Sequence, residues 1–223
     1  MTTTATPDET RPPAGRRRQA RAAATRNALL DAALREFAAH GFEGASTRRI
    51  ATAAGTHQPQ INYHFESKDE LWKAAVDHLF DRLDDAVRGS FGDTNPGWGT
   101  RTGFAANIRA FVQAAAGLPE LNRIMVPEAT IDSERLQWIV ERHTRPRFEV
   151  VTQHWGRLRA DGLVADIDET VLYYSLVGAA SLAYVNAPEA RLLGNDTLSE
   201  SFIEAHAEAL VTMLLGADEA VAR

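Results

Sequence analysis

Three amide side chains, Gln58, Gln60 and Asn62, stand close together in a short stretch with helical spacing. A glutamine or asparagine amide can donate and accept a hydrogen bond in one plane, and adenine presents the matching pair, N6 and N7, in the major groove of DNA. Amides near the N-terminal end of an exposed helix therefore suit the edges of base pairs. These residue types predict a base-reading helix.

The elements that must position these amides are two short helices within residues 47–65. In the first, Ile50, Ala51 and Ala54 recur at helical intervals and form a small apolar face. Gly55 follows, where a helix end favours a residue that tolerates positive φ, so the chain can turn sharply. The pattern predicts a helix of about two turns and a tight turn after it.

The second short helix begins just beyond the turn. Pro59 fits its first turn, where a missing N–H group is harmless, and Ile61 with Phe65 forms an apolar pair at i and i+4 that can pack on the first helix. The three amides then point outward. A helical hairpin of this length is also typical of ordinary packing, so the pattern alone leaves both interpretations open.

The charge distribution favours a nucleic-acid partner in spite of a net charge of −6. Residues 11–68 contain ten Lys or Arg against four Asp or Glu, whereas residues 69–223 contain fourteen against twenty-four. A basic head can approach phosphates while an acidic body resists non-specific adhesion. Arg16, Arg17, Arg18 and Arg21 can form a basic arm for the minor groove or simply a solvated tail.

Composition limits the class of protein. The 223 residues are 44% hydrophobic, enough for a sizeable core, and include no cysteine, which excludes disulfides and thiolate metal sites and favours a cytoplasmic location. The longest apolar run, residues 171–185, is too short and too often interrupted by small residues to cross a bilayer, so no membrane partner is expected. The seven histidines form no i, i+4 ligand pair, and no catalytic or cofactor motif is present, which predicts no enzyme, metal or cofactor.

Apolar stripes at helical spacing predict an all-α chain. One helix from about residue 20 to Gly41 supports the base-reading pair, and a second begins after Ser67, with Glu70 completing a capping box, and continues to about Arg88. A loop over residues 89–100 is followed by further helices, predicted over residues 104–117, 119–131, 134–160, 169–186 and 198–215. Pro146 is expected to kink the third of these.

Residues 25–72 resemble the N-terminal domain of the TetR family of transcriptional regulators. The resemblance rests on the segments LLDAALREFAAHGFEGAST, RRIATAAG, Tyr63-His64-Phe65 and SKDEL, in the family's order and spacing. It implies a three-helix helix-turn-helix domain followed by a helical ligand-binding and dimerisation domain. His57, where the family usually has a Ser or Thr cap, and Asn62, in place of a tyrosine, depart from the pattern and bear on which operator is read.

The resemblance also implies phosphate contacts that fix the register of the reader. It assigns them to Tyr63, His64 and Lys68, alongside Thr47 and Arg48 of the preceding helix; for His64, a ring satisfied by a neighbouring side chain is the alternative. The predicted DNA-binding set is therefore Thr47, Arg48, Gln58, Pro59, Gln60, Asn62, Tyr63, His64 and Lys68. The predicted boundaries are a disordered basic tail over residues 1–18, the helix-turn-helix domain over 19–66 and the effector-binding and dimerisation domain over 67–223.

Aromatic and soft side chains in the body predict a pocket for an unidentified small apolar or aromatic effector. The expected lining residues are Phe104, Phe111, Met125, Trp138 and Tyr173, with Trp98, Trp155 and Tyr174 in the same aromatic set and Glu128 and His143 as polar anchors. Such residues are also typical of a helical core, and a buried, hydrogen-bonded His143 is the alternative interpretation.

The helix over residues 169–186 is apolar almost all round and must be covered on more than one side. A two-fold partner can supply that cover, and the resemblance implies a homodimer built from the last two long helices; burial within one chain is the alternative. Together these features predict a repressor that binds palindromic double-stranded DNA and is released by a small effector. An activator, a regulator without an effector, and an enzyme with a structural helix-turn-helix remain alternatives.

Overall fold

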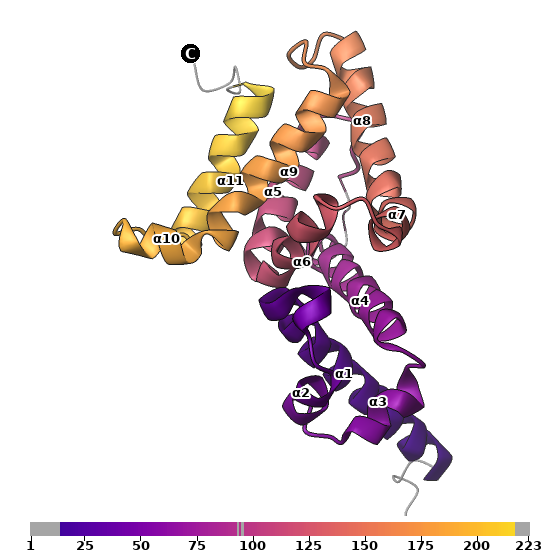
Figure 1. The fold of residues 1–223 in the computed structure, drawn as a ribbon. Helices are drawn as coiled ribbons and strands as arrows, with labels where there is room; N and C mark the ends of the chain where they lie inside the picture. Colours follow the sequence, from indigo (N-terminus) through magenta and orange to yellow (C-terminus); the bar gives the residue numbers. More distant parts are fainter. Residues whose placement is uncertain (1–13, 93, 95, 217–223) are drawn as a thin grey trace, which may run out of the picture. The chain divides into compact units, whose positions relative to one another are not determined.

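The structure is a computed structural model that describes residues 14–92, 94 and 96–216 (Figure 1). Every regular element in these residues is a helix, which confirms the all-α prediction. The helices are α1 (Ala14–Gly44), α2 (Thr47–Ala53), α3 (Gln58–His64), α4 (Lys68–Gly89), α5 (Arg101–Gly117), α6 (Pro119–Ala129), α7 (Glu134–Ile139), the π-helical turn η1 (Val140–Thr144), α8 (Arg145–Ala160), α9 (Glu169–Val185), α10 (Ala187–Leu192) and α11 (Glu200–Leu215).

The chain divides into two compact units between Val76 and Asp77, inside α4. The predicted domain boundary was Glu66, at the start of that helix. The division falls later because the first turns of α4 belong to the core of the first unit, where Trp72 is 1% exposed and makes an edge-to-face contact with Phe42 at 6.2 Å. Helix α4 therefore contributes to both units.

The first unit is organised by α1, whose apolar stripe is buried as its spacing predicted. Leu29, Leu34 and Phe37 are each at most 2% exposed. The helix is interrupted at Gly41, whose φ of 65° breaks the helical path near the predicted end. It begins at Ala14, earlier than predicted, because the arginines, alanines and glutamine that precede residue 24 have high helix propensity. The first thirteen residues of the expected tail lie outside the described residues.

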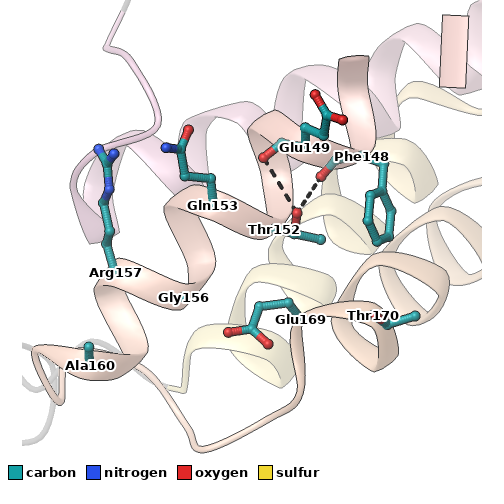
Figure 2. Close-up of a pocket in the computed structure, with 9 residues that line it drawn as sticks. All are labelled: Phe148, Glu149, Thr152, Gln153, Gly156, Arg157, Ala160, Glu169 and Thr170. Atoms are coloured by element: carbon teal, nitrogen blue, oxygen red, sulfur yellow. Dashed lines mark hydrogen bonds between the residues drawn. The ribbon is translucent and has the colours of Figure 1, made fainter. Parts of the chain in front are cut away.

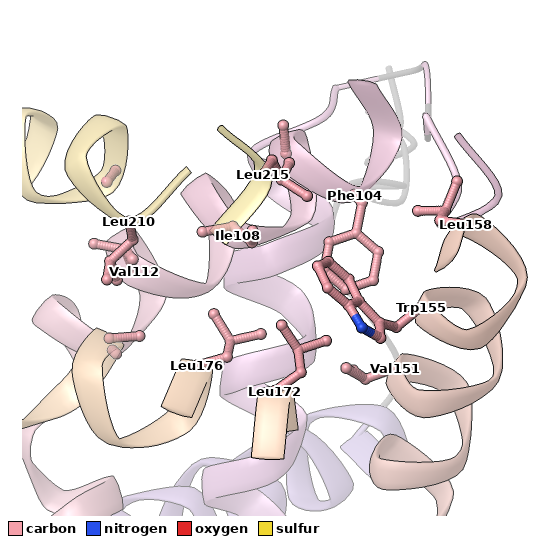
Figure 3. Packing of buried hydrophobic residues seen from close by; sticks show 14 of the residues in the cluster. Phe104, Ile108, Val112, Val151, Trp155, Leu158, Leu172, Leu176, Leu210 and Leu215 are labelled. Carbon is pink, nitrogen blue, oxygen red and sulfur yellow. The ribbon is translucent and has the colours of Figure 1, made fainter. Parts of the chain in front are cut away.

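The second unit has one core, shared by α5, α8, α9 and α11 (Figure 3). Phe104 is fully buried at its centre, with ring centroids 5.2 Å from Trp98 and 5.4 Å from Trp155. The indole N–H of Trp155 donates to the carbonyl oxygen of Ile167 at 2.9 Å, so its one polar group is satisfied inside the core.

The predicted helix over residues 134–160 is divided into α7, η1 and α8. Pro146 has no N–H group to donate and its ring crowds the preceding turn, so the helix widens into the π-helical turn just before it. Helix α10 occupies part of the expected linker between the last two long helices, with Pro188 in the first turn, where proline is tolerated. No helix in the described ranges is long and apolar enough to span a membrane.

Candidate DNA-binding site

The helix-turn-helix is fastened to α1 by the Glu36 carboxylate. This carboxylate accepts from the backbone N–H of Ser46 at 2.8 Å and from Nε of Arg49 at 2.8 Å, and its side chain is 11% exposed. Burial raises the pKa of Glu36, but the hydrogen bonds from Arg49 and Ser46 outweigh it, so the pKa is held below its ordinary value of 4.5. Local sequence patterns do not predict this cluster, because Ser46 and Arg49 lie 10 and 13 residues from Glu36 and the three residues follow no helical period.

The turn between α2 and α3 has the geometry that its sequence predicted. Ser46 caps α2 by accepting from the N–H of Arg49 at 3.4 Å, and Gly55 adopts a φ of 67°. The N–H of Thr56 then donates to the carbonyl oxygen of Ala51 at 2.9 Å, which closes the turn. Because glycine pays no steric cost at positive φ, α3 can leave the direction of α2 without strain.

Helix α3 packs against the rest of the first unit through its two predicted apolar residues. Ile61 and Phe65 are each 2% exposed, and the Arg26 guanidinium lies 5.4 Å from the centroid of the Phe65 ring. His57 precedes the helix and makes no side-chain capping hydrogen bond, whereas Pro59 occupies its first turn. Helix α3 is thus held from one side.

The predicted base-reading side chains lie on the other side of α3. Gln58, Pro59, Gln60 and Asn62 are all exposed. Nε2 of Gln58 donates to Oγ1 of Thr47 at 3.4 Å, which connects the start of α3 to the start of α2. The amides of Gln60 and Asn62 have no side-chain hydrogen bond within the described part of the chain. This arrangement leaves them available to donate to and accept from one external surface.

The predicted phosphate contacts lie beside this face. Arg48 is exposed, Tyr63 is 73% exposed and His64 is half-buried beneath it, with the two rings 4.9 Å apart. Burial, with Arg26 nearby, lowers the pKa of His64, which favours a neutral ring near pH 7. His64 can therefore donate one hydrogen bond to a phosphate oxygen without carrying charge.

Lys68 stands at the start of α4, where Ser67 caps the helix as predicted, but Glu70 does not complete the capping box because it accepts from Glu66 and not from Ser67. Oγ of Ser67 accepts from the N–H of Glu70 at 3.0 Å, and the Glu70 carboxylate accepts from the N–H of Glu66 at 2.5 Å. The Lys68 ammonium donates to the carbonyl oxygen of Glu43 at 3.2 Å and lies 4.9 Å from the centroid of the Phe42 ring. An ammonium has three donors, so Lys68 is oriented and still able to bind an anion.

The second unit contains a cavity of about 450 Å³ between α4, α5, α8 and α9. Phe111 and Tyr173 line it, as does Trp98. The structure places the other predicted effector residues elsewhere. Phe104 belongs to the core, and Met125 and Trp138 are half-buried outside the cavity lining.

The two predicted polar anchors lie beside charged protein groups, outside the cavity lining. The Glu128 carboxylate accepts from Nε of Arg135 at 3.1 Å. His143 is 7% exposed, stacks on Phe80 with centroids 4.2 Å apart, and has Nε2 2.9 Å from Oδ1 of Asp77. Burial lowers the pKa of His143, while Asp77 opposes that shift. In this arrangement His143 joins η1 to α4.

A larger hollow of about 860 Å³ lies on the outer side of α8 and the start of α9 (Figure 2). Two of its polar side chains have local partners: the Thr152 hydroxyl donates to the carbonyl oxygen of Phe148 at 2.8 Å, and the Glu169 carboxylate lies 3.0 Å from Nη2 of Arg159. Helices α8 and α9 approach closely at Gly156, where an added Cβ would lie 2.9 Å from Oε1 of Glu169. This open hollow is less suited to a small apolar ligand than the aromatic cavity.

Comparison with known proteins identifies the first unit. A family model described as bacterial regulatory proteins, tetR family, matches residues 29–75. The HTH-type transcriptional repressor AcnR of Corynebacterium efficiens is 42% identical over 50 residues, which are 22% of this chain and 27% of AcnR. The match therefore spans about a quarter of the length of this relative.

Solved structures are similar over nearly the whole chain. AibR, solved in complex with isovaleryl coenzyme A and operator DNA, is 21% identical with a TM-score of 0.64, over 87% of this chain and 100% of AibR. A TetR family transcription regulator from Marinobacter aquaeolei VT8 is 22% identical with a TM-score of 0.64, over 88% of this chain and 98% of its own. At these identities the likeness concerns the fold.

Fold and site together define a helix-turn-helix protein with a helical C-terminal domain, as predicted. Its N-terminal segment matches the family model and the repressor AcnR, and its helical fold matches that of a TetR family regulator. Residues 29–75 therefore match the DNA-binding segment of the tetR family of bacterial regulatory proteins.

The Glu36 cluster predicts a specific dependence of stability on pH. A carboxyl whose folded pKa is lowered stabilises the fold above its unfolded pKa, and that contribution is lost as the pH falls through the folded pKa. Glu36→Gln should therefore reduce the free energy of unfolding by about 1–3 kcal/mol near neutral pH, where it removes hydrogen bonds to a charge, and by less below about pH 4. Urea denaturation at both pH values measures this difference.

Glu43→Gln is the matched control, because Glu43 is exposed and its side chain makes no ion pair within the described residues. It should leave the free energy of unfolding nearly unchanged at either pH. A Glu36→Gln variant that lost no more stability than this control would contradict the fastening proposed for Glu36.

The site geometry also separates base readers from phosphate contacts. Gln58→Ala or Gln60→Ala should cost about 1–3 kcal/mol at particular base pairs and leave random duplex binding unchanged. Lys68→Ala should weaken binding to all duplexes alike and reduce the salt slope by about 1. Lys73→Ala, a charge change further along α4 where Lys73 pairs with Asp69 at 2.7 Å, is the control. Fluorescence anisotropy across a salt series measures both effects, and equal losses at Gln58 and Lys68 would contradict the division.

Proposed function

We propose that this chain is a transcriptional repressor that binds a palindromic operator as a homodimer and is released by a small-molecule effector. The observation that carries the proposal is helix α3, which is anchored by two buried residues, Ile61 and Phe65, and presents exposed amides on its free side. Such a helix matches the hydrogen-bonding pattern of adenine in the major groove. Since its target is chromosomal DNA, the proposed place of action is the cytoplasm.

The comparisons support this proposal by analogy. AcnR is a transcriptional repressor, and AibR was solved with both operator DNA and an acyl coenzyme A. An enzymatic function has no comparable support. No group of three or more His, Asp or Glu side chains within the described ranges is placed to hold a metal ion.

Helix α9 supports a dimer. Its exposed residues follow one stripe at helical spacing, and they include Val171 at 57%, Tyr174 at 68% and Leu182 at 61% exposure, with Gly178 between them. Large apolar side chains exposed along one stripe mark an interaction surface, and the glycine permits close approach of another helix. Helix α11 continues the apolar surface with Met213, which is 67% exposed. We propose that a second copy of the chain covers this apolar surface.

Release by an effector requires a connection between the cavity and α4, the helix that begins at Lys68. Two cavity residues form it: Nη2 of Arg147, on α8, donates to both carboxylate oxygens of Asp84, on α4, at 2.8 Å. The Arg147 guanidinium also lies 4.6 Å from the centroid of the Phe80 ring. A ligand that shifts Arg147 would therefore act on α4 directly.

A small movement of α4 is sufficient for regulation. Two base-reading helices must reach half-sites about 34 Å apart, or a multiple of that distance, so a modest tilt prevents simultaneous binding. A coupling of about 1–3 kcal/mol changes operator affinity roughly 5- to 150-fold. A regulator without an effector would be expected to have a filled body, so the cavity of about 450 Å³ favours the ligand-responsive form.

Selection of genomic DNA fragments by the purified full-length protein tests the proposed function. We expect the bound fragments to share a palindrome whose half-site centres are about 10–10.5 base pairs apart or a multiple of that spacing. Mixed random-sequence duplex in excess serves as competitor. Recovery of fragments with no common sequence would refute the proposal of a sequence-specific regulator.

The dimer is tested by placing a charge on the α9 stripe. Leu182→Glu should give a monomer in analytical ultracentrifugation and abolish tight binding to the palindrome, because a buried unpaired carboxylate opposes association. Val126→Glu, at an equally exposed apolar residue on α6, should remain dimeric. Persistence of the dimer in Leu182→Glu would show that another surface forms it.

A further inference from the structure

The effector cavity in the second unit is mainly apolar and aromatic. Its volume of about 450 Å³ lies within the range of small-molecule sites. Six of its lining side chains come from α4, the loop after it, α5 and α9: Leu83, Val87, Phe91, Trp98, Phe111 and Tyr173. Such walls accept a flat or ring-shaped apolar body.

The charged groups that line the cavity are neutralised by protein partners. Arg147 and Asp84 form the two-oxygen pair described above, and Nη2 of Arg88 lies 2.5 Å from Oδ1 of Asp85. A charged ligand would have to break one of these pairs or bring its own charge into an apolar space without a partner. The cavity therefore favours a neutral ligand.

One buried polar side chain in the cavity wall is paired through only one of its two polar atoms. Asn107, on α5, is 3% exposed, and its Nδ2 donates to the carbonyl oxygens of Gly97 at 3.0 Å and Gly103 at 2.9 Å. These two acceptors use both N–H groups of the amide and fix its orientation, since a flipped amide would set its oxygen against two carbonyl oxygens. Oδ1 of Asn107 has no hydrogen-bond partner among the described residues.

The protein thus offers an oriented hydrogen-bond acceptor in the wall of an apolar cavity. Such an acceptor needs water or a ligand as its partner. A ligand that supplies a hydroxyl or N–H group at this position satisfies the atom. A ligand of the same shape without a donor leaves it unpaired.

We propose that the effector is a neutral, ring-containing molecule that donates a hydrogen bond to Oδ1 of Asn107, and that this residue determines ligand specificity. This inference rests on the proposed function only in calling the ligand an effector. The Tyr173 hydroxyl, which makes no hydrogen bond with the described residues, is a second polar contact available to such a molecule.

Three matched probes test the proposal by equilibrium dialysis with the full-length protein. They are 2-naphthol, which carries a donor, 2-fluoronaphthalene, which has a similar shape and no donor, and 2-naphthoate, which is anionic. We expect 2-naphthol to bind at least about tenfold more tightly than either of the others, because only its neutral hydroxyl can donate a hydrogen bond to Oδ1 of Asn107.

Two variants locate the effect. Asn107→Leu should remove the preference for 2-naphthol over 2-fluoronaphthalene, whereas Phe111→Leu should weaken both and keep their ratio, since Phe111 contributes an apolar wall only. Circular dichroism checks that each variant folds. If Asn107→Leu does not fold, the comparison of the three probes on the unaltered protein still decides.

Equal binding of 2-naphthol and 2-fluoronaphthalene would overturn the assigned hydrogen bond, and tighter binding of 2-naphthoate would overturn the neutral class. Absence of binding by all three would overturn the ligand class as a whole. A parallel gel-shift assay with selected genomic fragments, without probe, keeps the two proposals apart. DNA binding with no probe preference removes only this inference, whereas probe preference without DNA binding removes only the proposed function.

Discussion

The half-buried Glu36 carboxylate fixes where the predicted base-reading pair of helices begins. It receives the N–H of Ser46 and the guanidinium of Arg49, both at the start of α2, so a side chain of α1 sets the position of that helix. Once α2 is placed, the positive φ of Gly55 sets the direction of α3. The exposed amides are thus positioned by one ion pair and one glycine.

Helix α4 serves two cores with different residues along its length. Trp72 packs in the first unit, whereas Phe80 and Asp84 contact His143 and Arg147 in the second. In the second unit α4 also buries Leu79 and Leu83, so it makes apolar, aromatic and polar contacts there. Polar contacts have specific geometry and can be exchanged for contacts to a ligand, whereas an apolar core tolerates displacement poorly. The polar contacts are therefore the ones that the proposed effector would alter.

The aromatic side chains of the second unit form two groups: some fill the hydrophobic core and others line the cavity. Phe104 and Trp155 fill the core, and the Trp155 indole has its own backbone acceptor. Phe111 and Tyr173 line the cavity instead. Asn107 also lines the cavity, with both N–H groups of its amide donated to backbone carbonyl oxygens.

The sequence by itself determined the features that depend on neighbours along the chain. Ser67 as a cap, Gly55 as a turn, and the stripe of Leu29, Ala33 and Phe37 act over four or fewer residues or one helical period, so local pattern predicts them. The all-α fold and the family resemblance of the N-terminal segment followed from the same local signals. Boundaries were less accurate: α1 begins earlier, and α4 is shared by two units.

Only the tertiary structure decided the contacts between residues far apart in the chain. Glu36 meets Arg49, and Asp84 meets Arg147 across 63 residues, and neither pair leaves a periodic signal. The same limit applies to the predicted effector residues: Phe104 and Phe111 lie on one helix with similar chemistry, yet one fills the core and the other lines a cavity. Composition does not distinguish these two positions, because the packing of the helices decides whether a side chain contacts other side chains or lines a cavity.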